Sequence, residues 1–284
     1  MASLKEVKGR IDSVKGTLKI TSAMKLVASA KYHKAQLAAG RLEEYQKELS
    51  GILEMLPAGA GMKQHAGGND AKTAVVALSS NSSLCGSFNT NVIAKAREAV
   101  SEEGGAENVV LYAIGRKVAD SFARTGLKSV RDYSELSAHP TYAEAAALAD
   151  ELVSGFNEGR FAKVVLVWSH YLSASSQKPT VETFLPYAVA EKSVSKEELL
   201  KEYIVEPSCE ELYAELLPKT LRLKIFAILL DSAASEHAAR MIAMQTATDN
   251  GNELLSDLTL EYNKGRQAKI TSEILDLAGG AAEG

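Results

Sequence analysis

The loop Ser80–Asn89 is the segment of this chain whose residue types come closest to a chemical site. It follows a predicted strand and precedes a predicted helix, a position where backbone N–H groups can bind phosphate. However, the loop contains one glycine, Gly86, and neither GxxxxGK[ST] nor GxGxxG occurs anywhere in the chain. The motifs therefore argue against a nucleotide site in this chain.

Cysteine and histidine offer a second kind of chemistry. Cys85 precedes a helix, where a thiol pKa can fall, and His170 closes a later strand, so a nucleophile and a base are conceivable. The five histidines show neither metal-ligand nor triad spacing. A thiol that packs a strand–helix turn is the favoured interpretation of Cys85, and His237, set among alanines, is interpreted as structural. No catalytic, metal-binding or cofactor-binding residue is predicted.

Composition narrows the class of protein. The 284 residues are 46% hydrophobic and 24% charged, which is ordinary for a soluble chain. No stretch approaches the roughly 18 to 20 apolar residues that a membrane span needs, and the N-terminal residues lack the apolar core of a signal peptide. The two cysteines, Cys85 and Cys209, suit a reducing compartment. These features predict a cytoplasmic protein without a membrane span.

Charge is unevenly distributed along the chain. Residues 1–41 hold nine Lys or Arg against Glu6 and Asp12, a local balance of +7, so residues 42–284 must sum to −11 for the net charge of −4. A solvated helix face would explain the basic segment, and so would attraction to an acidic partner. Nucleic acid is disfavoured as the partner, because the segment has one aromatic residue, Tyr32, and no recognised reading module.

Both ends of the chain have the pattern of long helices. All six prolines lie between Pro57 and Pro218, and unbroken helical flanks would span roughly 80 and 100 Å, against a radius of gyration of about 19 Å for a compact chain of this length. Each flank carries a heptad seam, which we define by its residues. The seam positions are Leu4, Val7, Ile11, Val14, Leu18, Thr21, Lys25, Ala28, Tyr32, Ala35, Ala39, Leu42, Gln46, Leu49, Leu53 and Leu56 in the first flank, and Leu223, Ala227, Leu230, Ala234, His237, Met241, Met244, Thr248, Gly251, Leu255, Leu258 and Tyr262 in the second.

The two flanks are expected to pair with each other. Since a middle domain separates them, an antiparallel coiled coil is the economical arrangement, although a bundle within an all-helical fold stays open from the seam alone. Ser208 and Glu211 predict a capping box at the start of the second helix, and Pro218 predicts a kink. The C-terminal part outruns its partner and should be covered by another chain, since a single amphipathic helix is marginal in water.

The middle of the chain alternates strand and helix patterns. Strands are predicted at 74–79, 109–114, 164–168 and 180–189, with a weaker candidate at 128–133, and helices at 91–103, 116–124 and 142–156. This alternation is typical of a doubly wound, Rossmann-like parallel sheet. The predicted fold class is therefore α/β plus a long α-helical coiled coil, with domains at 1–56, 72–192 and 208–284.

Three sequence segments resemble one family, the gamma subunits of F-type ATP synthases. They are IDSVKGTLKITSAMKLVASAKYHKA near the start, SSLCGSFNTNV in the middle, and SEHAARMIAMQTATDNGNELLSDLTLEYNKGRQAKITSEILDLAGGAA at the end. The resemblance covers nearly the whole chain in the family's order. It implies a non-catalytic rotor shaft of a proton-translocating machine, which couples rotation of a membrane c ring to the catalytic β subunits and regulates ATPase activity and ion flow.

The resemblance also implies partners and contact residues. Arg266, Gln267 and Thr271 match positions that hold a β-subunit loop, and Lys19 and Lys25 are placed to meet acidic segments of β. Tyr203 and Glu206 match the contact with the c ring, and the remaining partners are the α and epsilon subunits. No cofactor is implied. Without a transit peptide, the cytoplasmic face of a bacterial inner membrane is the expected location.

Two other classes of protein compete with this interpretation. An enzyme with its own nucleotide-binding domain would bind and turn over nucleotide as an isolated chain. A coiled-coil adaptor for another machine would purify without three copies each of α and β.

Overall fold

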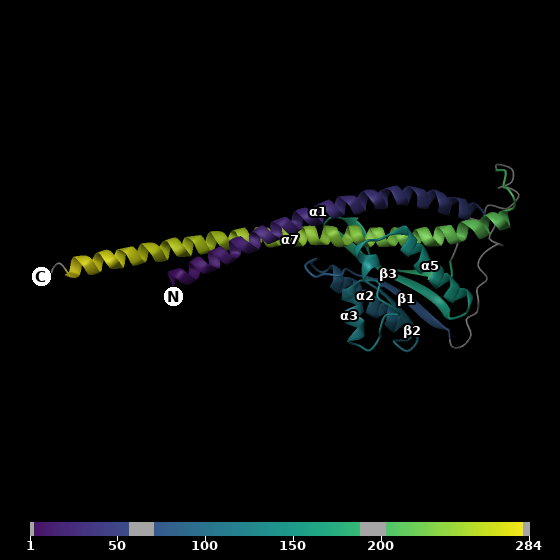
Figure 1. Ribbon diagram of the computed structural model, residues 1–284, viewed down its shortest axis with the longest axis horizontal. Helices are drawn as coiled ribbons and strands as arrows, with labels where there is room; N and C mark the ends of the chain where they lie inside the picture. Colours follow the sequence, from purple (N-terminus) through teal and green to yellow (C-terminus); the bar gives the residue numbers. More distant parts are fainter. Residues whose placement is uncertain (1–2, 57–70, 188–202, 281–284) are drawn as a thin grey trace. The chain divides into compact units, whose positions relative to one another are not determined.

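The computed structural model describes residues 3–56, 71–187 and 203–280, with side chains up to residue 275. The chain divides into two compact units, one of Met1–Ala28 with Met241–Gly284 and one of Ser29–Arg240. We call them the helical unit and the sheet unit. Helix α1 (Leu4–Met55) and helix α7 (Cys209–Gly280) contribute residues to both (Figure 1).

In the helical unit, α1 packs antiparallel on α7. Val7 and Ile11 form a buried cluster with Leu258, and further along α1 the Thr21 hydroxyl lies 2.9 Å from the Thr248 hydroxyl. Residues later in α1 therefore contact residues earlier in α7. The predicted antiparallel pairing is confirmed for this unit.

Two glycines of α7 allow the helices to approach closely. A Cβ added at Gly251 would lie 2.7 Å from Leu18 Cδ2, and one added at Gly265 would lie 3.1 Å from Leu4 Cδ2. The two leucines are fourteen residues apart, as are the two glycines, so the same contact recurs after two heptads. These paired contacts give the helices a defined register.

The predicted seam residues are confirmed as the inward-facing positions of both helices. Every seam position is buried or half-buried, including the two clearly polar ones of α1, Lys25 and Gln46. On α1, and on α7 beyond Met241, the positions between them are largely exposed, among them Ile20, Leu26 and Leu37, each more than 60% exposed. A narrow apolar stripe of this kind is typical of coiled-coil packing, whereas residues 223–240 of α7 are buried or half-buried all round because they also pack on the sheet.

The start of α7 follows the predicted cap. The backbone N–H of Glu211 donates to Ser208 Oγ at 3.1 Å, which confirms the first half of the predicted capping box. The kink predicted at Pro218 does not interrupt the helix, because α7 runs from Cys209 to Gly280 with Pro218 inside it. Leu217 and Leu221 on either side are buried in the core of the sheet unit, which stabilises this turn despite the missing N–H.

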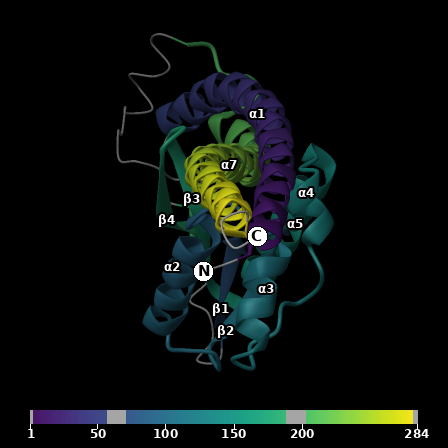
Figure 2. The same ribbon diagram turned by 90° about the vertical axis from the view of Figure 1, so that its left-hand side faces the viewer.

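The sheet unit contains a four-stranded sheet in the order β2-β1-β3-β4. Strands β1 (Lys72–Leu78), β2 (Val109–Ile114) and β3 (Phe161–Ser173) are parallel, and β4 (Ser176–Leu185) returns antiparallel to β3 at the edge (Figure 2). The α/β prediction is confirmed, with one antiparallel edge strand that makes the sheet mixed. Pro179 lies on that edge strand and Pro186 follows it, at the periphery of the sheet where a residue without an N–H is tolerated.

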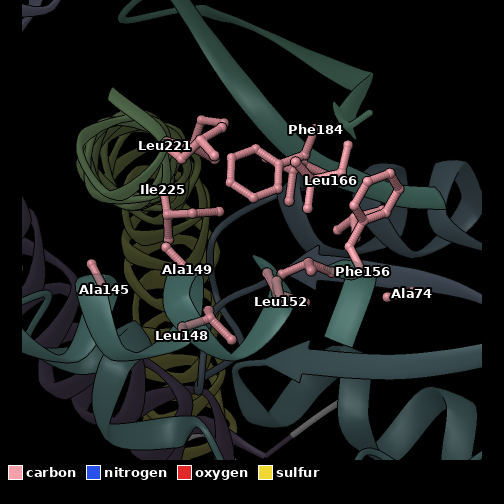
Figure 3. Close-up of a cluster of buried hydrophobic side chains, with 14 of the residues drawn as sticks. Ala74, Ala145, Leu148, Ala149, Leu152, Phe156, Leu166, Phe184, Leu221 and Ile225 are labelled. Atoms are coloured by element: carbon pink, nitrogen blue, oxygen red, sulfur yellow. The ribbon is translucent and has the colours of Figure 1, made fainter. Parts of the chain in front are cut away.

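Helices cover both faces of the sheet. Val75 and Ala77 of β1 face the buried residues of α2 (Phe88–Glu102) and α3 (Arg116–Ala123), whereas Ala74, Val76 and Leu78 face the opposite layer. That second layer consists of α5 (Tyr142–Asn157), the N-terminal half of α7 and the end of α1. Leu148 and Leu152 of α5 lie there with Leu221 and Ile225 of α7 (Figure 3), and Leu53 of α1 belongs to the same cluster. The alternation of side chains along a strand therefore places α7 directly on the sheet.

One predicted element is wrong. Residues 128–133 do not form a strand but make a single parallel bridge, Leu111 with Ser129, and are followed by the short helix α4 (Ser134–Ala138). The hydroxyl of Ser129 accepts a hydrogen bond from Ala113 N at 3.0 Å. This side-chain hydrogen bond takes the place of one that a neighbouring strand would make through its backbone. Charged residues at 128, 131 and 132 remain exposed, which explains why the segment does not continue the sheet.

The contact of α5 with β3 provides a stability test. A Cβ at Gly155 would lie 2.4 Å from the Phe161 ring, so Gly155→Ala should lower the free energy of unfolding by about 1–3 kcal/mol despite the better helix propensity of alanine. Gly51→Ala in α1, where nothing lies within 4 Å, should be neutral or stabilising by up to about 1 kcal/mol. Urea denaturation of both variants measures the difference. Equal stabilities would contradict this packing.

Candidate functional site

The loop after β1 is stabilised by its own polar side chains. Ser80 N donates to Asn89 Oδ1 at 3.0 Å, and Asn89 Nδ2 donates to Cys85 Sγ at 3.1 Å. Cys85 is 1% exposed. The thiol is thus enclosed by its neighbours, in agreement with the packing role favoured for it.

Arg240 of α7 connects the helix to this loop. One of its guanidinium nitrogens, Nη2, donates to Ser82 Oγ at 2.8 Å and to the Ser83 carbonyl at 3.3 Å, and another, Nη1, to Glu236 Oε1 at 2.5 Å. Burial raises the pKa of Glu236 above its ordinary value, although Arg240 and Lys31 act in the opposite direction. The sequence analysis did not identify this connection.

A second polar connection joins α7 to the end of β3. Asp231 Oδ2 accepts from Trp168 Nε1 at 2.8 Å and lies 2.8 Å from His170 Nδ1, while Oδ1 accepts from Tyr171 N at 3.0 Å. The next residue along the strand, Tyr171, also contacts α1, since its hydroxyl lies 2.5 Å from the hydroxyl of Tyr32. Burial and this hydrogen bond raise the pKa of Tyr32 to about 12. His170 therefore pairs with Asp231 and not with Cys85.

His237 has the structural environment that the sequence suggested. Its Nδ1 is buried without a hydrogen-bond partner in the described structure. Burial, followed by the charges of Arg240 and Lys31, lowers the pKa of His237 to about 4, so the ring is neutral at pH 7. Among the residues that the structure describes, no group of His, Cys, Asp or Glu is placed to hold a metal ion.

The residues predicted to contact β lie in two places within the helical unit. Arg266, Gln267 and Thr271 are exposed near the C-terminal end of α7, where Thr271 Oγ1 donates to the Gln267 carbonyl at 2.9 Å. Lys19 is exposed and Lys25 half-buried on α1, near the level of Gly251 and Thr248. Arg266 is fifteen residues further along α7 than Gly251, roughly 20 Å at the rise of an α-helix. The fold therefore places Arg266 and the two lysines at separate levels along the helix pair and does not bring them together.

The C-terminal end of α7 is exposed. All residues from 266 to 275 are exposed, including the large apolar side chains Ile270 at 47%, Ile274 at 59% and Leu275 at 65%. Leu4, the first residue of α1, contacts α7 at Gly265, so the pairing ends where the exposed stretch begins. This matches the prediction that the second helix outruns the first.

The residues predicted to contact the c ring precede α7. Tyr203 is 51% exposed, Glu206 is exposed, and Ile204 between them is 92% exposed. This short segment presents apolar and acidic side chains to the surroundings. Within the described part of the chain, no helix is long and apolar enough to cross a membrane.

Comparison with known proteins agrees with these features. The family model described as ATP synthase matches residues 3–283. The ATP synthase gamma chain of Phocaeicola vulgatus is 48% identical over 99% of both chains, and that of Bacteroides thetaiotaomicron is 45% identical over the full length of both.

Solved structures share the fold. A chain of the Euglena gracilis mitochondrial ATP synthase, in a structure of OSCP, F1 and the c-ring, superimposes with a TM-score of 0.68 at 18% identity, covering 98% of this chain and 93% of that one. A chain of the Tetrahymena thermophila central stalk and c-ring gives 0.55 at 24% identity, over 80% of this chain and 99% of that one. From the family match and the full-length relatives it follows that this chain belongs to the ATP synthase gamma chain family.

Proposed function

We propose that the chain is the central rotor shaft of a proton-translocating F-type ATP synthase. The observation that carries the proposal is α7, a single helix of 72 residues that packs on the sheet through Leu221 and Ile225, pairs with α1 through Leu258, and ends in an exposed stretch. A helix that is anchored at one end and bare at the other is suited to transmit rotation into a ring of partners. The proposed partners in that ring are the α and β subunits.

The shaft acts as a ligand of the catalytic ring. It changes the conformation of a β subunit only through contacts whose free energy differs between conformations, and rotation presents each β subunit with a different side of the helix pair. Catalysis belongs to the partner subunits, and this chain supplies the mechanical coupling and thereby regulates ATPase activity and ion flow. We retain 1–56, 72–192 and 208–284 as the proposed working parts.

Two groups of basic and polar residues are proposed to contact β. Arg266 offers a planar guanidinium that binds a carboxylate through two hydrogen bonds, and Gln267 and Thr271 lie on the same exposed stretch. Lys19 and Lys25 belong to a segment with a charge of +7, which attracts acidic segments of β over a distance. The exposed apolar residues Ile270 and Ile274 provide the buried area that such a contact needs.

Tyr203 and Glu206, which precede α7 in the sheet unit, are proposed to contact the c ring. Their exposure, together with that of Ile204, leaves them free to bind the polar loops of a membrane subunit. The epsilon subunit is the remaining proposed partner. As part of a membrane-associated complex, the chain is proposed to lie at the cytoplasmic face of the bacterial inner membrane.

Arg266→Ala tests the contact with β. We expect proton-driven ATP synthesis by membranes that carry this variant to fall about tenfold, since one charge-assisted hydrogen bond contributes roughly 1.5 kcal/mol or more, while the amount of assembled complex stays unchanged. Lys264→Ala, an exposed charge two residues away on roughly the opposite side of the helix, is the matched control and should retain synthesis. Unchanged synthesis in Arg266→Ala would remove Arg266 from the coupling contact.

Two truncations of α7 distinguish the role of the packed part of the helix from that of its exposed C-terminal end. A chain that stops after Gly265 keeps the Leu258 cluster and loses the exposed stretch, so it should assemble but couple poorly. A chain that stops before Leu254 also loses Leu255 and Leu258, and both assembly and coupling should fall. Proton pumping and subunit content of purified membranes measure the two effects. Full coupling after the shorter deletion would show that the bare end is dispensable.

Isolation of the native complex tests the assignment as a whole. A tagged chain should co-purify with three copies each of α and β, and the isolated chain should neither bind nor hydrolyse ATP at micromolar concentrations. Recovery of the chain without α and β, or turnover of ATP by the chain alone, would overturn the rotor assignment.

A further inference from the structure

A groove of about 650 Å³ lies beneath α1 in the sheet unit. Its walls come from residues 36–46 of α1, from the ends of β3 and β4, and from residues 224–234 of α7. This volume falls within the range of small-molecule sites in proteins. The groove is separate from the residues assigned above to β and to the c ring.

The groove lies between two places at which α1 is fixed to the rest of the sheet unit. At one place Tyr32 contacts Tyr171, and at the other Leu49, Leu53 and Leu56 are buried. The residues between that line the groove have small or polar side chains, which cannot fill the space as leucines would. They are Gln36, Ala39, Gly40, Glu43 and Gln46.

The opposite wall is fixed by its own hydrogen bonds. Asp231 is held by the indole of Trp168, by His170 and by the Tyr171 N–H, and the Lys224 ammonium pairs with Glu182. A wall whose side chains are already positioned loses little conformational entropy when a ligand binds.

The lining of the groove carries an excess of negative charge and also contains apolar surface. Glu43, Glu182 and Asp231 contribute three carboxylates against the single ammonium of Lys224, and His170 is paired with Asp231. Glu43 makes no hydrogen bond or ion pair with any described residue. Apolar surface lies between the charges, from Ala39, Ala227, Ile228 and Ala234.

From these features we infer that the groove binds a linear aliphatic polyamine. Its ammonium groups would pair with Glu43 on α1 and with the carboxylates of Glu182 and Asp231 opposite, while its methylene chain covers the alanines and Ile228 between them. Because the ligand would bridge α1 and α7, it would stiffen this part of the helix pair, and this inference does not depend on the rotor role.

Trp168 is the one tryptophan of the chain and lines the groove, so its fluorescence reports occupancy. Titration of the full-length chain with spermidine at constant ionic strength should give a saturable change in that fluorescence. Glu43→Gln should raise the apparent Kd about tenfold, because one close carboxylate–ammonium pair is lost. Glu44→Gln, an exposed neighbour outside the groove, is the matched control and should leave Kd within about twofold of the wild type.

Magnesium chloride and sodium chloride separate the polyamine from charge alone. Neither salt should reproduce the fluorescence change, since neither supplies an apolar chain. The inference is overturned if spermidine produces no saturable change, if Mg²⁺ produces the same change, or if Glu43→Gln and Glu44→Gln bind equally well.

Discussion

The close packing of α1 against α7 is the constraint on which the rest of the structure depends. Leu4 and Leu18 each lie over a glycine of α7, and the Thr21 and Thr248 hydroxyls meet further along. A leucine over a glycine permits one register, because a slip would place the leucine against a side chain. Two segments that are more than 200 residues apart in the chain are thereby held in one alignment.

The sheet gives this pair its anchorage. Apolar residues of α7 pack on the face of β1 that carries Ala74, Val76 and Leu78, and polar contacts at Asp231 and Arg240 connect the same helix to β3 and to the loop after β1. Polar bonds of this kind are directional, so they resist rotation of the helix about its own axis, whereas apolar packing alone tolerates small slips. The helix is therefore joined to the sheet unit through both kinds of interaction.

Local patterns predicted much of this fold. The heptad seam identified the inward positions of both helices, since a 3.5-residue repeat directly reports which side is buried, and apolar runs identified four strands. The strand predicted at 128–133 is wrong because the charged residues of this short run stay exposed and the Ser129 side chain, in place of a backbone ladder, accepts from Ala113 N of the neighbouring strand. The polar contacts of Asp231 and Arg240 could not be predicted, because their partners at Trp168 and Ser82 are brought near only by the packing of distant elements. One weak sequence feature points to Asp231: it is an acidic residue that directly follows two large apolar residues, Leu229 and Leu230, which are buried in the structure.

The central claim is that α1 and α7 turn together as one rod, and a cross-link tests it most directly. Cysteines at the positions of Thr21 and Thr248, whose hydroxyls are 2.9 Å apart, should form a disulfide on oxidation. In membranes containing the complex, ATP synthesis should be the same before and after oxidation, because a rod that moves as a unit is unaffected by an internal bond. A loss of synthesis on oxidation that is restored by reduction would show that the helices must separate or slide, and would contradict the account.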